Sequence, residues 1–585
     1  MKRKKMIALL LSMTMACSIL GGCGGKENPG PQGGGSGSDK QSGAQEGGSG
    51  SGGQSGAQES GSGSEGQPDS GSASGGGEEE RELLPDGNTY ATGLPIVKDK
   101  ITLRIARGQN ALDSGTDTNE KPIMKLMEEA TNIHIEWIDV PAGDGFDEQM
   151  SILLTTDMPD AFMGGVGTTD IMKDYESFVP LNDLMETYAP HIMETYNKTD
   201  GAAIAALTYP NGNIYSFMSS VYTQHASWTI GVQFINKKWL ENVGKEIPRT
   251  LDEYYDVLKA FKEMDANGNG DPNDEIPLGY CQNNFQARLI QFMGAFGFND
   301  YFRLEDGKVI PTANTDEYRQ FLEYYNKLAK EGLFDIEGFS QTDQQFMAKA
   351  KQGLYGSFYA WTPDTIIDDA ELAGQYVQLL PMTAPGLEGK ETVYGTINRF
   401  MGNIGGFAIT SACEYPEALV RWYDYMGSST EMKQTARIGE QGVMWEMRDG
   451  KVYELQNQGP DFNFQNACYT YGLMQSCPVL LYPDELAAVD EETSPQNYAR
   501  ESYVTAVEDW ILEEGLMPSR IATEEATLEL SSYETDLLNY ISSFTADAIM
   551  NGVTDASWEQ HLADLEKYRY SDWIEWKQNY LEGKF

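Results

Sequence analysis

Histidine and cysteine are scarce in this 585-residue chain, which has 4 histidines and 6 cysteines. No two histidines share a short motif, and no C-x-x-C pair or zinc-site spacing occurs. These absences exclude H-E-x-x-H zinc chemistry and weigh against a histidine-centred catalytic triad. Beyond residue 23 the sequence leaves two alternatives open for its thiols: Cys468 and Cys477 pair, or all of them are free, namely Cys281, Cys413, Cys468 and Cys477.

Basic side chains are also in short supply, with 42 Lys plus Arg against 89 Asp plus Glu and a net charge of -47. A surface this acidic repels phosphate, so we expect no nucleic-acid partner and no binding of the folded surface to anionic lipid. Aromatic residues are plentiful instead, at 10 Trp, 32 Tyr and 22 Phe. Aromatic faces suit the apolar faces of sugar rings, although the same residues also build cores.

The first residues predict export and a lipid anchor. Lys2 to Lys5 form a basic segment, residues 6–20 are largely apolar, and Leu20-Gly21-Gly22-Cys23 follows. The apolar run is too short to span a membrane comfortably and fits a signal peptide over residues 1–22. Small residues ending at a cysteine resemble a bacterial lipobox, which implies cleavage before Cys23 and diacylation of its thiol. A plain signal peptide with an incidental cysteine is the alternative.

Residues 23–82 then form a Gly/Ser-rich stretch with almost no apolar side chains. Such a segment cannot bury enough surface to fold, so we interpret it as a flexible tether that spans on the order of 40 Å. The remaining 500 or so residues are too many for one hydrophobic core, which predicts at least two lobes.

The start of the folded part has the pattern of a parallel sheet. Ile101, Leu103 and Ile105 alternate, residues 123–130 have helical spacing, and residues 133–137 alternate again. A strand, a helix and a strand in about forty residues is a βαβ unit. Because ligands gather at the carboxyl ends of such strands, residues 107–110 are a candidate edge of a binding site.

An amphipathic helix followed by an acidic loop is the strongest local pattern. Thr250 and Glu253 have the spacing of a capping box, which predicts a helix from Thr250. The loop after it, residues 265–275, carries oxygen-bearing side chains at every second position up to Asn273. A calcium ion needs about six to eight oxygens, so the loop predicts a cation site. A solvated turn is the alternative, and Ile276 stands where an EF-hand has its bidentate glutamate.

Candidate ligand-binding residues lie where the chain is expected to cross between lobes or where a strand ends. Trp361 is the strongest, because it follows a predicted buried strand and precedes a Pro-Asp loop. Each candidate could instead belong to a core or an interface. The full set is Tyr222, Trp228, Tyr359, Trp361, Arg399 and Trp445.

Several stretches together resemble extracellular solute-binding proteins of family 1, the substrate-binding lipoproteins of ABC importers. They are the lipobox at Cys23, FINKKWL at 234–240, PRTLDEYYDVLKAF at 248–261, DANGNGDPNDEIPL at 265–278, GGFAITSACEYPEALVRW at 405–422 and the helical tail. The likeness runs from about residue 95 to the end and is strongest toward the oligosaccharide-binding branch, in which such a loop holds calcium.

The resemblance implies an α/β, two-lobed periplasmic-binding-protein-like fold of type II, with hinge crossings between the lobes. On this basis we expect lobe 1 to comprise residues 83–228 with 404–435, and lobe 2 residues 229–403 with 436–585. It also implies a structural Ca²⁺ bound by the side chains of Asp265, Asn267, Asn269, Asp274 and Glu275 and by the carbonyl of Asp271. The loop is one residue longer after Gly270 than the shortest family form, which leaves open whether Asn273 or Asp274 faces the ion.

The implied function is capture of an oligosaccharide or another small solute between the lobes and its delivery to a permease. The resemblance further implies a monomer without enzymatic activity, anchored through Cys23 on the outer face of a bacterial cell membrane. Two alternatives stay open: a surface-tethered carbohydrate-active enzyme, for which no catalytic motif stands out, and a sensory or adhesion lipoprotein.

Overall fold

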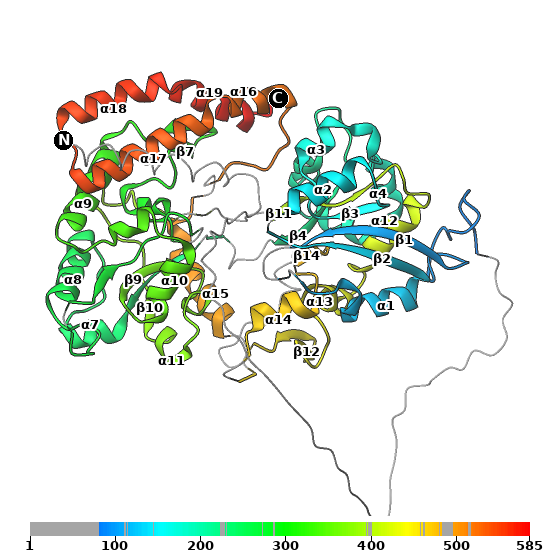
Figure 1. Cartoon of the computed structure of the whole chain (residues 1–585), viewed down its shortest axis with the longest axis horizontal. Helices are drawn as coiled ribbons and strands as arrows, with labels where there is room; N and C mark the ends of the chain where they lie inside the picture. Colours follow the sequence, from blue (N-terminus) through cyan, green and yellow to red (C-terminus); the bar gives the residue numbers. More distant parts are fainter. Residues whose placement is uncertain are drawn as a thin grey trace, which may run out of the picture.

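The computed structural model describes residues 81–585, except 110–112, 114, 144, 223–227, 230, 272, 285–286, 394, 396–400, 457, 460–461, 475, 479, 482–494 and 513–515. These residues form an α/β protein with two lobes, each built around its own sheet (Figure 1). The two-lobed α/β architecture expected from the sequence is therefore confirmed.

The first lobe has a six-stranded mixed sheet in the order β14-β4-β11-β3-β1-β2. β1 (Ile101–Gly108) pairs in parallel with β2 (Ile133–Val140) and with β3 (Ala161–Met163), and α1 (Pro122–Thr131) connects the first two. The predicted βαβ unit is confirmed. β11 (Met401–Ile409) runs antiparallel to β3 and to β4 (Phe217–Tyr222), so the chain returns to this sheet after its excursion into the second lobe.

Besides α1, further helices pack around this sheet and contribute apolar side chains to its two core clusters. They are α2 (Phe146–Thr155), α3 (Thr168–Lys173), α4 (Asn182–Tyr188), α5 (Pro190–Asn197), α6 (Ala202–Leu207), α12 (Pro416–Tyr425) and α13 (Thr430–Ile438).

The second lobe has a four-stranded sheet in the order β10-β5-β9-β6. β5 (Val232–Asn236) and β9 (Tyr355–Ala360) lie at its centre, flanked by β10 (Tyr376–Gln378) and β6 (Ile276–Leu278). The helices are α7 (Lys237–Val243), α8 (Leu251–Glu263), α9 (Asp316–Lys330), α10 (Asp343–Lys351), α11 (Ala370–Ala373), α15 (Pro495–Val507), α16 (Glu524–Ser531), α17 (Glu534–Asn551), α18 (Asp555–Lys567) and α19 (Tyr570–Leu581).

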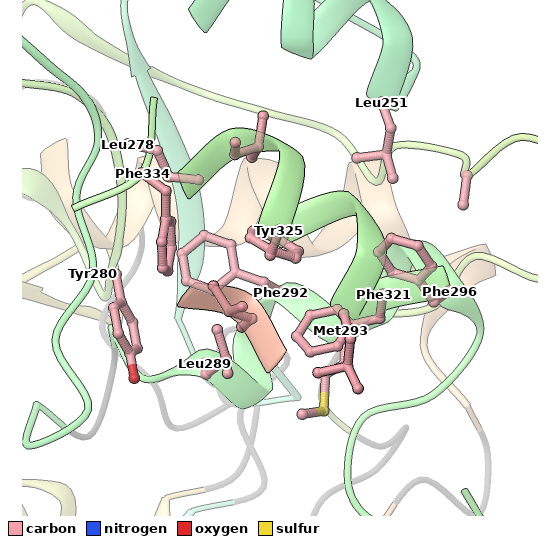
Figure 2. Close-up of a cluster of buried hydrophobic side chains, with 14 of the residues drawn as sticks. Leu251, Leu278, Tyr280, Leu289, Phe292, Met293, Phe296, Phe321, Tyr325 and Phe334 are labelled. Carbon is pink, nitrogen blue, oxygen red and sulfur yellow. The ribbon is translucent and has the colours of Figure 1, made fainter. Parts of the chain in front are cut away.

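The core of the second lobe is rich in aromatic side chains. The 3-10 helix η4 (Leu289–Phe296) places Phe292 and Phe296 against Phe321 and Tyr325 of α9 (Figure 2). A hairpin turns at Asp306-Gly307 between β7 (Phe302–Glu305) and β8 (Lys308–Pro311), and both turn residues have positive φ.

The expected boundary between lobe 1 and lobe 2 at residues 435 and 436 is wrong, because the chain leaves lobe 1 for the last time only after that point. A small unit of β12 (Trp445–Arg448), β13 (Lys451–Glu454) and α14 (Phe464–Tyr471) follows α13. After it, Leu473 and Cys477 are buried in the core of the first lobe, and β14 (Leu480–Leu481) pairs with β4. The burial of Leu473 and Cys477 in this core and the pairing of β14 with β4 assign the segment to lobe 1.

The thiols Cys281, Cys413, Cys468 and Cys477 are all free, so of the two alternatives the free-thiol one holds. In the described part of the chain, no helix is long and apolar enough to cross a membrane.

Candidate functional site

Two chain segments that connect the lobes lie side by side. Thr229, between β4 and β5, forms an antiparallel bridge with Gly395, which precedes β11. The two backbones approach so closely that a Cβ atom at position 395 would lie 2.0 Å from the carbonyl oxygen of Trp228. Only glycine has no Cβ, which explains the residue type at this position. The two connecting segments thus meet at a tight junction.

Arg500 of α15 fastens this junction to the second lobe. Its guanidinium carbon lies 4.4 Å from the ring centroid of Trp361, and its Nη2 donates to the carbonyl oxygen of Thr229 at 3.0 Å. The side chain is buried, and burial lowers the pKa of Arg500 to about 10. No motif in the sequence marks this arginine, because its partners lie more than a hundred residues away.

Trp228, Tyr359 and Trp361 are each half-buried, and they come from one crossing segment and from the carboxyl end of β9. Tyr359 packs edge-on against Phe292 at 4.8 Å. These three predicted residues therefore surround the region where the lobes join. Aromatic faces that are neither fully buried nor fully exposed are suited to a ligand with apolar ring faces.

The other predicted ligand residues do not join this group. The indole of Trp445 is 1% exposed, and its Nε1 donates to the carbonyl oxygen of Gly439 at 2.9 Å. Its ring therefore belongs to the core of the small unit, because β12 turns it inward against Met444 and Cys468, and the prediction for Trp445 is not upheld. Arg399 and the side chain of Tyr222 lie outside the described residues.

The predicted site edge at residues 107–110 contains a buried ion cluster. Arg107 pairs with Asp113, and Lys121 Nζ lies 3.2 Å from Asp113 Oδ1; all three side chains are almost fully buried. Lys121 also donates to the carbonyl oxygen of Tyr469 at 2.6 Å, which ties the small unit to this edge. Burial lowers the pKa of Lys121, and the adjacent carboxylate opposes that shift. The cluster ties Asp113 to the end of β1 and to Lys121.

A cavity of about 40 Å³ lies beneath the lobe junction, within the second lobe. Gly231 and Val393 of the two crossing segments form part of its wall, together with Tyr359 and Tyr503. Its remaining wall comes from η4, from α9 and from residues 379–382. The cavity is therefore a hollow directly under the candidate ligand residues.

The acidic loop lies at the end of α8, whose capping box at Thr250 and Glu253 is present as predicted. Asn267 Nδ2 and Asn269 Nδ2 both donate to the carboxylate of Asp274, at 2.9 and 2.6 Å. Asn273 instead turns its amide to Asp271. Between the two candidates that the sequence left open, Asp274 is the one that faces into the loop.

Two carboxylate oxygens in this loop are buried without a hydrogen-bond partner in the described part of the chain. They are Asp265 Oδ1 and Glu275 Oε2. Glu275 is only 1% exposed, and burial raises the pKa of its carboxyl group. No cluster of three or more His, Cys, Asp or Glu side chains arranged for a metal occurs among the described residues. The unpaired oxygens nevertheless fit a hard cation, whose ligands would also include asparagine and backbone oxygens.

Comparison with known proteins identifies the family of this chain. Residues 113–433 match the model of the bacterial extracellular solute-binding protein family. The chain belongs to this family.

Three curated or solved relatives illustrate the similarity. The fructooligosaccharide ABC transporter substrate-binding protein FusA of Streptococcus pneumoniae is 26% identical over 538 residues, which cover 86% of this chain and 94% of that protein. The polygalacturonan/rhamnogalacturonan-binding protein YtcQ of Bacillus subtilis is 24% identical, covering 77% and 84%. An extracellular solute-binding protein of Bifidobacterium longum subsp. infantis superimposes with a TM-score of 0.71 at 20% identity, covering 83% and 98%.

Structures of FusA are similar in fold as well. The complex of FusA with kestose has a TM-score of 0.67 at 24% identity and covers 83% of this chain and 99% of that protein. A second structure is an EF-hand mutant of FusA in complex with fructo-nystose, with a TM-score of 0.66.

Proposed function

We propose that this protein captures a neutral oligosaccharide between its lobes and delivers it to the permease of an ABC importer. The observation that carries the proposal is the group of half-buried aromatic rings at the lobe junction, Trp228, Tyr359 and Trp361, with Arg500 stacked on one of them. Rings placed at crossings can change their contacts when lobes close on a ligand. The names of the relatives FusA and YtcQ support a carbohydrate ligand and, for FusA, an ABC transporter.

The protein is proposed to be a binding protein without catalytic activity. A glycosidase needs two carboxylates that face its cleft at a set separation. The support for binding without catalysis is that the relatives FusA and YtcQ are named as binding proteins. Incubation with oligosaccharides should therefore release no new reducing ends, whereas a surface-tethered enzyme would release them.

We propose that Cys23 is the lipid anchor and that residues 24–82 tether the lobes to the outer face of the membrane. Cys23 and residues 24–80 lie outside the described residues, and the support comes from the lipobox pattern and from a relative named lipoprotein LipO. Growth with an alkyne fatty acid should label the wild-type chain and leave Cys23→Ala unlabelled; label on both chains, or on neither, would contradict the anchor.

We propose further that the acidic loop binds a structural Ca²⁺. Asp265 and Glu275 would supply their unpaired oxygens, with Asn267, Asn269 and Asp274 beside them and the carbonyl of Asp271 as a further ligand. Bound there, the ion would neutralise the buried carboxylates and hold α8 against its loop. The EF-hand variant made of FusA supports this role for the loop.

The test of the proposed function is a binding screen with the full mature chain. Kestose, maltotriose, cellotriose, mannotriose and trigalacturonate are titrated while intrinsic tryptophan fluorescence and the melting temperature are recorded. A saturable response to at least one neutral oligosaccharide is expected, and it should weaken at least tenfold in Trp361→Ala, which corresponds to about 1.4 kcal/mol. No response to any sugar would contradict the proposal.

A further inference from the structure

Arg500 lies where two neighbouring strands of the second sheet separate. β5 and β9 are antiparallel, and their pairing ends with Val232 opposite Ala360. Beyond this pair, the chain before β5 includes Thr229 of a connecting segment, and the chain after β9 continues directly into Trp361. The side chain of Arg500 contacts both of them, through the ring of Trp361 and the carbonyl oxygen of Thr229. It therefore joins a proposed ligand residue to a connection between the lobes.

The helix that carries Arg500 is fixed to the sheet by apolar side chains. Tyr503, Val504 and Val507 of α15 are buried in the same hydrophobic cluster as Val232 of β5. Arg500 itself is 5% exposed. Its guanidinium is therefore held by the packed second lobe and does not move freely in solvent.

Trp361 depends on such a support more than a residue within a strand does. It follows the last residue of β9 and lies in a bend, outside the paired strands. The guanidinium carbon of Arg500 lies 4.4 Å from the centroid of its ring, so the cation covers one face of the indole. Because Trp361 is only half-buried, part of its ring remains accessible to a ligand.

The two contacts of Arg500 together fix the orientation of the indole. A guanidinium is planar, so it can stack on a ring with its face while its N–H groups donate in its plane. Here Nη2 donates to the carbonyl oxygen of Thr229 at 3.0 Å and lies 3.4 Å from the hydroxyl oxygen of the same residue. A lysine ammonium has no plane and cannot make both kinds of contact with this geometry.

We propose that Arg500 is a positioning residue for ligand binding: anchored on Thr229, it holds the indole of Trp361 in the orientation that receives the sugar. The inference rests on the proposed function and deepens it. Arg500 acts through the ring and does not itself contact the ligand, because its own side chain is buried. Its effect on sugar affinity should therefore exist only when Trp361 is present.

The test is a double-mutant cycle on the full mature chain. Dissociation constants for the neutral oligosaccharide found in the screen are measured for the wild type, Arg500→Met, Trp361→Ala and the double variant. With Trp361 present, Arg500→Met should weaken binding roughly 5- to 30-fold, because the ring loses its stacked support. In the Trp361→Ala background the same change should alter the dissociation constant by less than about twofold, since residues that act as one unit are not additive.

Two further variants make the cycle specific. Arg500→Lys keeps the charge and loses the planar group, so it should weaken binding by more than about twofold and by less than Arg500→Met does. Arg569→Met is the matched control, because the guanidinium carbon of Arg569 lies 4.1 Å from the ring centroid of Tyr533 among the C-terminal helices. Its dissociation constant should stay within twofold of the wild type.

The outcomes separate the inference from the proposed function. If the wild type binds a neutral oligosaccharide and Arg500→Met binds it equally well, the inference is wrong and the proposed function stands. The same holds if Arg500→Met weakens binding equally with and without Trp361, or if Trp361→Ala binds like the wild type. If neither Arg500 variant folds, Arg500 is a requirement of the fold and a separate positioning role is rejected. If the wild type binds no sugar, the proposed function fails, and the inference fails with it.

Discussion

Each lobe contains a cluster of buried or half-buried charged side chains, and the two clusters are satisfied in different ways. In the first lobe, Asp113 lies between Arg107 and Lys121, so positive and negative groups are in direct contact. In the second lobe, Asp265 and Glu275 each have a carboxylate oxygen that is buried in the acidic loop without a hydrogen-bond partner among the described residues. Neither carboxylate takes part in an ion pair of the described residues.

The difference shows how each lobe compensates the charges that it buries. A buried charge is tolerated when an opposite charge and hydrogen bonds compensate its lost hydration. The first cluster has that compensation from its own chain and is complete after folding. In the acidic loop, Glu275 Oε1 accepts from Ala266 N and Asp265 Oδ2 accepts from Gly270 N, while the second oxygen of each carboxylate is buried without a partner among the described residues. This contrast is why we propose the loop, and not the ion cluster, as the cation site.

Breaking the first cluster should have the largest effect on stability. Asp113→Asn removes the carboxylate that contacts both Arg107 and Lys121 and leaves these two buried cations with the more distant carboxylate of Asp139, which lies 4.0 Å from Arg107. The expected loss in the free energy of unfolding is about 3–5 kcal/mol, measured by urea denaturation. As a control, Lys100→Ala breaks an exposed pair with Glu128 and should cost less than about 1 kcal/mol. Equal losses of unfolding free energy in the two variants would mean that the buried cluster stabilises the fold no more than the exposed pair does.

Removing calcium from the acidic loop should have the next largest effect. Chelation with EGTA should lower the stability of the wild-type chain by about 3 kcal/mol relative to calcium at a hundred times its dissociation constant. Glu275→Gln should abolish this response, since it removes a buried negative charge from the loop. Glu263→Gln changes an exposed carboxylate at the end of the same helix and should respond like the wild type. A wild-type melting curve unchanged by EGTA would contradict calcium binding by the acidic loop.

The same carboxylate sets the pH dependence of that response. Burial raises the pKa of Glu275 in the folded protein, so without calcium its contribution to stability is present below its ordinary pKa and is lost as the pH rises through the raised value. Calcium needs the ionised form, so its affinity should fall as the pH is lowered toward the raised pKa. Calcium titrations from pH 7.5 down to pH 5 should show this weakening in the wild type.

Local patterns in the sequence predicted much of the fold. Thr250 with Glu253 and the alternation in β1 and β2 each specify a structure through neighbours in the chain, and each prediction is confirmed. Contacts between distant segments were not predictable in this way. The contact of Arg500 with Trp361 joins residues from separate elements, and no spacing rule links them.

The candidate site was predictable only as far as residue type and strand position allow. Trp361 and Tyr359 follow from the end of a buried strand, and they lie at the lobe junction. Trp445 has the same residue type in a glycine-flanked stretch, but tertiary packing buries it in the small unit.

The most direct test of the account measures sugar binding and calcium binding in the same three proteins. The wild type, Trp361→Ala and Glu275→Gln are each titrated in a calorimeter, in the presence of calcium, with the neutral oligosaccharide found in the screen. The calcium response of each protein is the change in its stability on addition of EGTA. The account predicts that Trp361→Ala loses at least tenfold in sugar affinity and keeps its calcium response, while Glu275→Gln loses the calcium response and binds sugar within threefold of the wild type. Undiminished sugar binding by Trp361→Ala, together with its loss in Glu275→Gln, would place the ligand at the loop and contradict the account.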